Sequence, residues 1–231
     1  VLQVLTGLGN ITGQALGRHM DVDCLVFTGS TEIAKKFLNY SAESNMKSVW
    51  PETGGKSANI RFADADLELA VDKAIFGAFY NQGEVCSANS RILLEESIYG
   101  DFLEKFIEKS LQIKLGDPLD PETTMGSLID INHAKNVQNA ILTAIDQGAK
   151  HINPYELTLP NHLDKKSFIA PTMLTSVCPN HDIFHEEIFG PVVSITTFKN
   201  EEEAIILANN SIYGLAGCIW TQNIKRAIAL S

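Results

Sequence analysis

The chain has 231 residues, of which 45% are hydrophobic and 20% charged, a balance typical of a folded globular protein with one large domain or parts of two. Its net charge of -10 argues against nucleic acid and against an anionic membrane surface as partners, because both favour basic patches. The sequence also has no apolar run near the roughly 18 residues that a membrane-spanning helix needs.

The four cysteines are far apart and show no Cys-x-x-Cys spacing. This pattern predicts free thiols in a reducing compartment, and therefore a cytoplasmic location, instead of a disulfide framework. Core packing accounts for Cys24, Cys178 and Cys218, which lie in or beside apolar runs. The chain starts without Met on an apolar run and stops within a helical pattern, so we expect it to be a piece of a longer protein.

Residues 1–62 alternate short apolar runs with helical patterns. In chain order they predict a strand at 1–5, a short helix at 13–19, a buried strand at 24–29, a helix at 30–42, and strands at 48–50 and 57–62. In the longer helix Ile33, Phe37 and Tyr40 share one face, and Ser30 is placed as the N-cap. The alternation favours a parallel sheet with crossover helices.

The remainder contains clearer helices and a strand-rich end. Its strongest helical pattern starts after Asp64 or Asp66, either of which would cap it, and runs through Leu67, Ala70, Val71, Ala74, Ile75, Ala78 and Phe79. The further elements predicted are a strand at 91–96, a helix at 97–111, a loop at 115–126, a helix near 137–145 that Gly148 ends, strands at 168–174, 191–198 and 217–221, and an acidic helix at 201–209. The chain is therefore α/β, with a seam near the PETGGK segment at 51–56.

Two glycine-containing turns could face a nucleotide. TGLGNITG, residues 6–13, follows a predicted strand, but Thr12 stands where the G-x-G-x-x-G fingerprint needs its third glycine, and Gly13 comes one residue late. A purely structural turn is the simpler interpretation of this segment. FTGST ends a strand at Gly29 and starts a helix at Ser30, which would leave unpaired N–H groups and a positive dipole end as a phosphate site. Plain N-capping is the alternative.

The PETGGKS segment offers a carboxylate, Glu52, between an apolar strand and two glycines. Trp50 and Pro51 would raise the pKa of this carboxylate if they bury it, and a general base would result. A solvated loop glutamate is the simpler interpretation. The segment is not a Walker A loop, because Trp50 stands where that motif requires glycine.

Two further groups of residues carry side chains suited to metal or thiol chemistry. His181 and His185 are spaced i, i+4, but no third ligand is evident, so no metal site is predicted. Cys86 follows the strongest helix in a loop of small and polar residues, YNQGEVCSANSR. Either it packs as an ordinary thiol, or it is accessible and activated by a helix N-terminus or a nearby cation. The residues alone leave both possibilities open.

PETGGKSA, followed by NQGEVCSA with its cysteine 34 residues after the glutamate, resembles the paired signatures of the NAD(P)-dependent aldehyde dehydrogenase superfamily. FTGST upstream and EEIFGPV at 186–192 occur in that family's order and near its spacing. SIYGDF, DPLDPETTMG and NNSIYGLAG look like it too, so the resemblance covers essentially the whole chain. WPETGGKSAN, LLEESI and DPLDPETTMG are most similar to a bacterial γ-glutamyl-γ-aminobutyraldehyde dehydrogenase subgroup, although Pro51 replaces the aliphatic residue usual before the glutamate.

The resemblance implies that residues 1–54 are the end of a Rossmann-like NAD-binding domain. Residues 55–231 would be an α/β catalytic domain of aldehyde dehydrogenase type, incomplete at its C-terminus. It also implies Cys86 as the nucleophile and Glu52 as the general base. The cofactor contacts that it implies are Ser30 at the pyrophosphate, Glu187 at the nicotinamide ribose, Phe189 beside the nicotinamide, and the backbone of Gly9, Gly13, Gly29, Thr53 and Gly54.

The implied reaction is oxidation of a small aldehyde to a carboxylic acid, with NAD+ preferred and NADP+ possible. A thiohemiacetal on Cys86 would give up hydride, and water activated by Glu52, at a pKa raised toward neutrality, would hydrolyse the resulting thioester. The Cys86 backbone N–H would be one oxyanion donor, and the second, an asparagine, would precede residue 1. The full-length protein would be a homodimer or homotetramer.

Two alternatives to this reaction stay open. One is a non-catalytic, nucleotide-binding fragment, against which the presence of both Cys86 and Glu52 speaks. The other is an acylating enzyme that passes the acyl group to coenzyme A. The presence of Glu52, a candidate base for the hydrolytic water, favours water as the acceptor.

Overall fold

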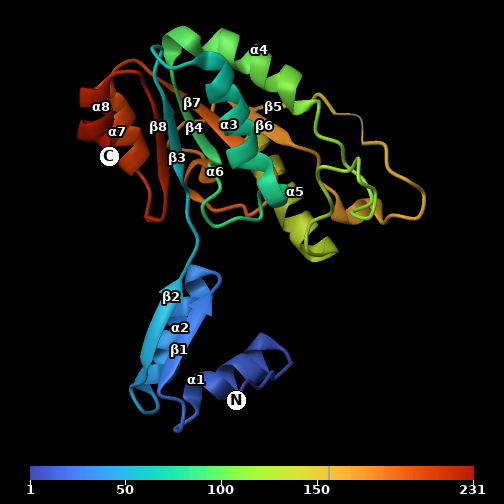
Figure 1. Cartoon of the computed structure of the whole chain (residues 1–231), viewed down its shortest axis with the longest axis vertical. Helices are drawn as coiled ribbons and strands as arrows, with labels where there is room; N and C mark the ends of the chain where they lie inside the picture. The colour runs from blue at the N-terminus through green and yellow to red at the C-terminus, as the bar shows by residue number, and fades with distance from the viewer. Residues whose placement is uncertain (156) are drawn as a thin grey trace. The chain divides into compact units, whose positions relative to one another are not determined.

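The computed structural model describes residues 1–155 and 157–231, which fold into two compact units, Val1–Gly54 and Gly55–Ser231 (Figure 1). Both units combine helices with parallel strands, so the α/β class predicted from the sequence is confirmed. The roles assigned above to residues 1–54 and 55–231 stay a prediction.

The first unit is a two-stranded parallel sheet with helices packed beside it. Its elements are a π-helical turn η1 (Gly9–Gly13), α1 (Gln14–Arg18), β1 (Cys24–Thr28), α2 (Thr31–Ala42) and β2 (Ser48–Glu52). The two strands pair so that Thr28 lies opposite Glu52. Lys47 is buried just before β2 and donates from Nζ to the Gly17 carbonyl at 2.7 Å, which fixes α1 against the start of that strand.

Several predictions for this unit are wrong. Residues 1–5 form no strand and are exposed, because apolar residues make a strand only where a partner strand supplies hydrogen bonds. β1 is a strand but not a buried one. Phe27 packs on the Phe37 ring of α2 with 4.8 Å between centroids, whereas Val26 on the opposite face is 74% exposed. Cys24 shares that exposed face, so it is not a core thiol.

The second unit holds a six-stranded sheet in the order β5-β6-β7-β4-β3-β8, in which only β5, at one edge, is antiparallel to its neighbour. The strands are β3 (Ala58–Arg61), β4 (Arg91–Glu95), β5 (Lys150–Ile152), β6 (Thr172–Thr175), β7 (Val192–Phe198) and β8 (Gly217–Trp220). All but β5 coincide with strands that the sequence predicts, although β6 extends one residue beyond its predicted end, to Thr175. A strand as short as β5 gives no readable alternation.

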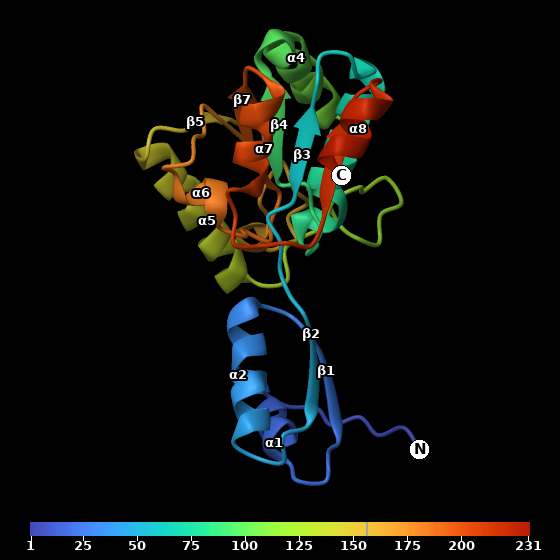
Figure 2. The ribbon, with the colours of Figure 1, turned by 90° about the vertical axis from the view of Figure 1, so that its left-hand side faces the viewer.

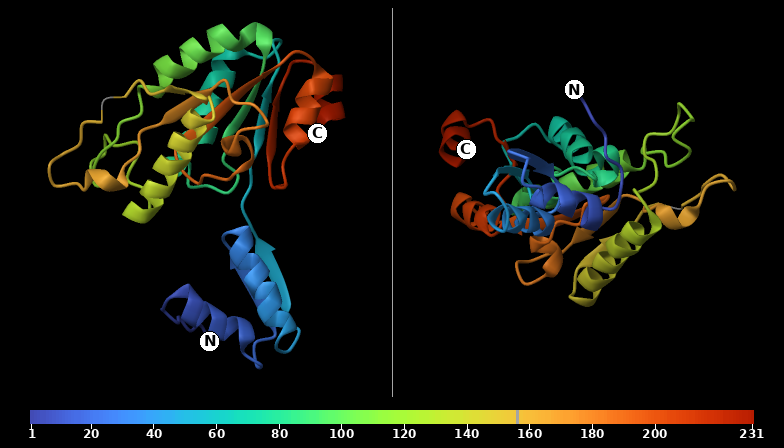
Figure 3. Two further views of the ribbon diagram at one scale, coloured as in Figure 1. Left: turned by 180° about the vertical axis from the view of Figure 1, so that it is seen from behind. Right: turned by 90° about the horizontal axis from the view of Figure 1, so that it is seen from below.

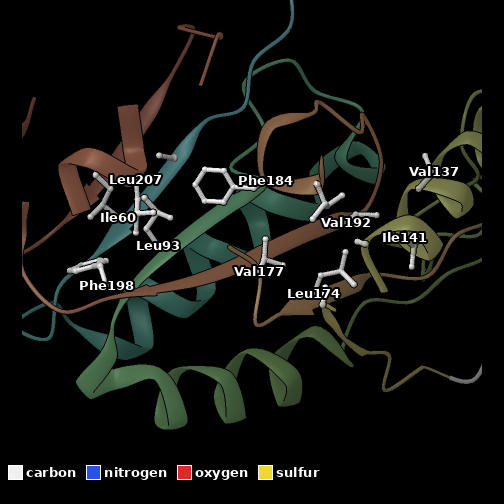
Figure 4. Packing of buried hydrophobic residues seen from close by; sticks show 14 of the residues in the cluster. Ile60, Leu93, Val137, Ile141, Leu174, Val177, Phe184, Val192, Phe198 and Leu207 are labelled. Atoms are coloured by element: carbon white, nitrogen blue, oxygen red, sulfur yellow. The ribbon is translucent and has the colours of Figure 1, made fainter. Parts of the chain in front are cut away.

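Helices cover both faces of this sheet (Figures 2 and 3). They are α3 (Leu67–Phe79), α4 (Tyr99–Ser110), α5 (Ile131–Asp146), α6 (Asp182–His185), α7 (Glu201–Asn209) and α8 (Ile224–Leu230), with 3-10 turns η2 (Tyr80–Gly83), η3 (Glu96–Ile98) and η4 (Lys165–Ser167). α3 and α4 pack against Ile92 and Leu94. α5, α6 and α7 pack on the other face, around Leu93 and Leu174 (Figure 4). The pleat of β4 thus sends alternate residues into two cores.

Local signals set the ends of the long helices. Asp66, not Asp64, caps α3 by accepting the Leu69 N–H at 3.0 Å. Asp130 caps α5 by accepting two backbone N–H groups at 2.7 and 2.8 Å. Gly148 follows α5 with a φ of +107°, a conformation that favours glycine, as the sequence predicts.

Arg91, at the start of β4, is a buried cation that the hydrophobic pattern gave no reason to expect. Its guanidinium donates to the carbonyl oxygens of Leu207 and Ala208 at 2.8 Å each. It also donates to the Lys56 carbonyl at 3.2 Å. Arg91 therefore satisfies the last carbonyls of α7 and ties them to the segment that enters β3.

Lys56 is also buried, with 3% of its surface exposed. Burial, helped by the Arg91 guanidinium and opposed by Glu187 and Glu186, lowers the pKa of its amine from 10.5 to about 7. At pH values between about 7 and 10.5, the amine carries a proton in the unfolded chain but not in the folded chain. The free energy of unfolding therefore rises with pH through this window, because the unfolded state binds more protons there.

We expect Lys56→Met to raise the free energy of unfolding by on the order of 1 to 4 kcal/mol near neutral pH, because it removes the cost of burying a charged amine. The difference in the free energy of unfolding between the variant and the unsubstituted protein should shrink as pH rises, because the unsubstituted protein then buries a neutral amine. Urea unfolding at about pH 6.5, 8 and 9.5 measures this difference, with the exposed Lys73→Met as the control. A difference that does not change with pH would contradict the assignment.

Candidate functional site

Three segments that are far apart in the sequence meet at one edge of the large sheet. Residues 55–57 lead into β3, residues 86–90 into β4, and residues 187–191 into β7. These strands are neighbours in the order β7-β4-β3 and are parallel, so their amino ends lie together. Cys86 and Glu187, both predicted as site residues, are thereby placed at the same edge.

Cys86 is partly buried, in a segment whose backbone is unusually constrained. Before it, Asn81 and Gln82 adopt positive φ values of 48° and 57°, and Gly83 one of 71°. A Cβ on Gly83 would lie 2.2 Å from the Gly190 carbonyl oxygen, so only glycine fits there. The loop thus passes directly against the segment that precedes β7. The surroundings of Cys86 are therefore neither an apolar core nor a freely solvated loop.

Gly55 joins the same arrangement from the third segment. A Cβ at Gly55 would lie 2.8 Å from the Cys86 carbonyl oxygen and 3.2 Å from Leu215 Cβ. Its N–H donates to Glu187 Oε1 at 3.3 Å. Because Gly55 has no side chain, its backbone can approach the backbone of Cys86. Its N–H also orients the Glu187 carboxylate.

Glu187 presents a half-buried carboxylate at this edge. Burial raises its pKa above the usual range, while the Gly55 N–H and the Lys56 amine act in the opposite direction. A carboxylate held in this way can accept hydrogen bonds from hydroxyl groups of a ligand. Such a group suits the ribose of a dinucleotide, which is the role that the resemblance implies for it.

Phe189 is exposed and adopts a left-handed backbone conformation with a φ of 54°. Its carbonyl oxygen lies 2.6 Å from Nε2 of His133, and the two rings meet edge to face with 6.3 Å between centroids. Glu84 of the Cys86 segment lies within 3.6 Å of the same nitrogen. Sequence reasoning missed His133 and Glu84, because neither follows a local pattern that indicates a partner so far along the chain.

In the first unit, other predicted residues gather at the carboxyl ends of β1 and β2. The Gly29 N–H donates to the Glu52 carbonyl at 3.0 Å, and Ser30 Oγ accepts the Ile33 N–H at 3.3 Å, which confirms the predicted N-cap. A Cβ on Gly29 would lie 2.5 Å from the Phe27 ring. Thr53 follows directly at the same edge. The first turn of α2 therefore points its N–H groups out of this edge, an arrangement of the kind that can bind a phosphate group.

Glu52 differs from its predicted setting. It is the last residue of β2, not a loop residue, and it is exposed. Trp50 is 63% exposed and Pro51 is exposed as well, so these neighbours do not bury the carboxylate as expected. The strand alternation places Trp50 and Glu52 on one face, and this face of the two-stranded sheet has no covering layer within the first unit.

The predicted glycines Gly9 and Gly13 bound the η1 turn, away from this edge. A Cβ on Gly13 would approach the ring of Phe37 at 3.5 Å, about two helical turns along α2 from Ser30. Gly54 is buried. The structure thus brings Gly29, Ser30 and Thr53 together, but it places Gly9 and Gly13 beside another part of α2.

Of the other candidate residues, His185 has a local hydrogen-bond partner, whereas the buried Nδ1 of His181 has none within the described residues. Nε2 of His185 lies 2.7 Å from the Pro179 carbonyl, and His181 is buried at the start of α6. Cys178 and Cys218 are partly buried. In the described ranges, 1–155 and 157–231, no cluster of three or more His, Cys, Asp or Glu residues could hold a metal ion. Nor do these ranges contain a helix with the length and apolar character that crossing a membrane requires.

Residues 1–231 match the Aldehyde dehydrogenase family. The NADP/NAD-dependent aldehyde dehydrogenase PuuC of Escherichia coli (strain K12) is 46% identical over 232 residues, covering 100% of this chain and 46% of that protein. The structure of aldehyde dehydrogenase KauB from Pseudomonas aeruginosa matches with a TM-score of 0.92 and 46% identity, over 98% of this chain and 46% of KauB. Betaine aldehyde dehydrogenase (betB) from Staphylococcus aureus, solved in complex with NAD+, gives a TM-score of 0.92 and 38% identity over 97% and 44% of the two chains.

The chain spans about half the length of the relatives that it matches. The likeness to solved structures confirms the predicted fold class, an α/β fold of aldehyde dehydrogenase type. Because the family match extends over every residue and a solved member has the same fold over 98% of the chain, this chain belongs to the aldehyde dehydrogenase family.

Proposed function

We propose that this chain carries the reactive thiol and much of the cofactor site of an enzyme that oxidises an aldehyde to a carboxylic acid with NAD(P)+. The supporting observation is the meeting of Gly55, the Cys86 segment and Glu187 at one sheet edge. Left-handed backbone and a half-buried carboxylate are each costly to fold. A purely structural role gives no reason to gather them around a cysteine.

In the proposed reaction, the Cys86 thiolate attacks the carbonyl carbon of the aldehyde and forms a thiohemiacetal. The Cys86 backbone N–H stabilises its oxyanion. As the carbonyl reforms, the C–H hydrogen leaves with its electron pair and a thioester remains; when bound, the nicotinamide of NAD(P)+ supplies the hydride acceptor. Glu52 takes a proton from the water that attacks the thioester, which releases the carboxylic acid and the thiolate.

Each unit, taken by itself, offers groups that suit one part of a dinucleotide. Ser30 and the first turn of α2 would hold the pyrophosphate, with Gly29, Thr53 and Gly54 giving the backbone room to approach it. Glu187 would accept hydrogen bonds from the nicotinamide ribose, and Phe189 would pack beside the nicotinamide. Gly9 and Gly13 would shape the turn before α1. Both NAD+ and NADP+ are candidates, because betB is described in complex with NAD+ and PuuC as NADP/NAD-dependent.

The substrate would be a small aldehyde, and the wording of WPETGGKSAN and LLEESI favours a γ-glutamyl-γ-aminobutyraldehyde type. The full-length enzyme would be a homodimer or homotetramer. A cytoplasmic location fits the four free cysteines, since a reducing compartment keeps thiols from pairing.

Replacing the nucleophile tests the proposal directly. We expect Cys86→Ser to lower the rate of aldehyde-dependent NADH formation by about 10³-fold or more, because a hydroxyl without an adjacent base is a poor nucleophile. Absorbance of NADH measures the rate, and Cys178→Ser is the matched control. Site-resolved alkylation of all four cysteines, with and without NAD+, adds a readout that needs no turnover. Cys86 reacting no faster than Cys178 in the folded parent would contradict the assignment.

Replacing the general base separates the two halves of the reaction. We expect Glu52→Gln to lower steady-state turnover by about 10² to 10⁴-fold while the first equivalent of NADH still forms, since only thioester hydrolysis needs the base. Mass spectrometry should then show the acyl group on the Cys86 peptide. Added coenzyme A should yield no acyl-CoA with the parent. Formation of acyl-CoA would favour the acylating alternative, and absence of a burst would remove Glu52 from this role.

A further inference from the structure

The start of α5 contacts both segments that surround the proposed site. The Ile129 N–H, just before the helix, donates to Glu84 Oε1 at 3.1 Å. One turn later, His133 Nε2 lies 2.6 Å from the Phe189 carbonyl oxygen and 3.6 Å from the same Glu84 oxygen. A single imidazole nitrogen therefore lies between the Cys86 segment and the segment that carries Glu187 and Phe189.

The hydrogen bond has only one possible direction. A carbonyl oxygen accepts but cannot donate, so Nε2 of His133 must carry the hydrogen and donate it to Phe189. The His133 and Glu84 side chains are largely buried, with 22% and 10% of them exposed, whereas Phe189 is exposed. Partial burial of the donor and of the neighbouring carboxylate strengthens such a hydrogen bond relative to one in open solvent.

Phe189 needs such a partner, because a phenylalanine at a φ of 54° is in a strained backbone conformation. α5 restrains the next residue as well. A Cβ on Gly190 would lie 2.8 Å from Val137 Cγ2, and Val137 is one turn beyond His133 on the same helix face. Two consecutive residues of the segment are thus held by two consecutive turns of α5.

We propose that His133 is a positioning residue, which holds the Glu187–Phe189 segment in its cofactor-binding conformation and joins it to the Cys86 segment through Glu84. The inference rests on the proposed function for its link to NAD+, but its structural part does not. Without the donor, Phe189 loses the bond that offsets its strain, and the neighbouring Glu187 carboxylate loses its fixed direction. The consequence is weaker cofactor binding, not a change in the chemical step.

The test compares two substitutions that fill similar space. His133→Phe keeps an aromatic ring but removes the donor, whereas His133→Gln keeps a donor. His151→Ala, at an exposed position on β5, is the control. Amide hydrogen exchange over residues 186–191 and 80–90 is measured by mass spectrometry without cofactor. The dissociation constant for NAD+ is measured by calorimetry, and KM and kcat are measured where turnover is detected.

We expect His133→Phe to raise exchange at residues 186–191 and to weaken NAD+ binding by about fivefold to thirtyfold, the loss that one hydrogen bond typically gives. KM for NAD+ should rise with it and kcat should change little. His133→Gln and His151→Ala should stay within about twofold of the parent. Equal behaviour of His133→Phe and His133→Gln, or unchanged exchange in His133→Phe, would overturn the proposal.

The outcomes separate this inference from the proposed function. If exchange responds to His133→Phe and is restored in His133→Gln, the positioning role of His133 stands even where the parent shows no aldehyde oxidation. If the unsubstituted protein oxidises aldehydes through Cys86 but His133→Phe changes neither hydrogen exchange nor NAD+ affinity, the proposed function stands and the positioning role fails.

Discussion

The candidate site depends on the parallel pairing of β3, β4 and β7. Strands that run in one direction are all entered from the same edge, so the residues just before them converge although they are far apart in the chain. Arg91 stabilises the convergence of these segments. Its guanidinium bonds the end of α7 to the Lys56 carbonyl, which fixes the path of the chain as it enters β3 next to Gly55.

The edge is crowded, and glycine is what makes the crowding possible. Gly55 lets its backbone reach the Cys86 carbonyl, and Gly83 lets the Cys86 segment reach Gly190. The same crowding leaves Asn81, Gln82 and Phe189 in left-handed conformations. Such strain persists only where surrounding contacts over-determine it, and for Phe189 the start of α5 supplies such a contact through His133.

The candidate site residues of the two units lie at opposite ends of the strands in their respective sheets. In the first, Gly29, Ser30, Glu52 and Thr53 lie at the carboxyl ends of β1 and β2, where open α/β sheets usually bind ligands. In the second, Cys86 and Glu187 precede their strands and lie at the amino ends. A rule drawn from the first kind of site would have placed the thiol at the wrong edge, so the position of Cys86 had to come from the observed strand order.

The sequence by itself determined the features that depend on neighbours along the chain. These are the apolar faces of α3 and α5, the cap of α3, the glycine stop after α5, the strands of the large sheet other than β5, the cap at Ser30, and the motifs around Glu52 and Cys86. Only the tertiary structure decided which surfaces are covered, so the exposure of β1 and residues 1–5 and the burial of Lys56 and Arg91 had no local signal. The contact between His133, Glu84 and Phe189 was equally hidden, because it joins three segments that meet only once the sheet and α5 have packed together.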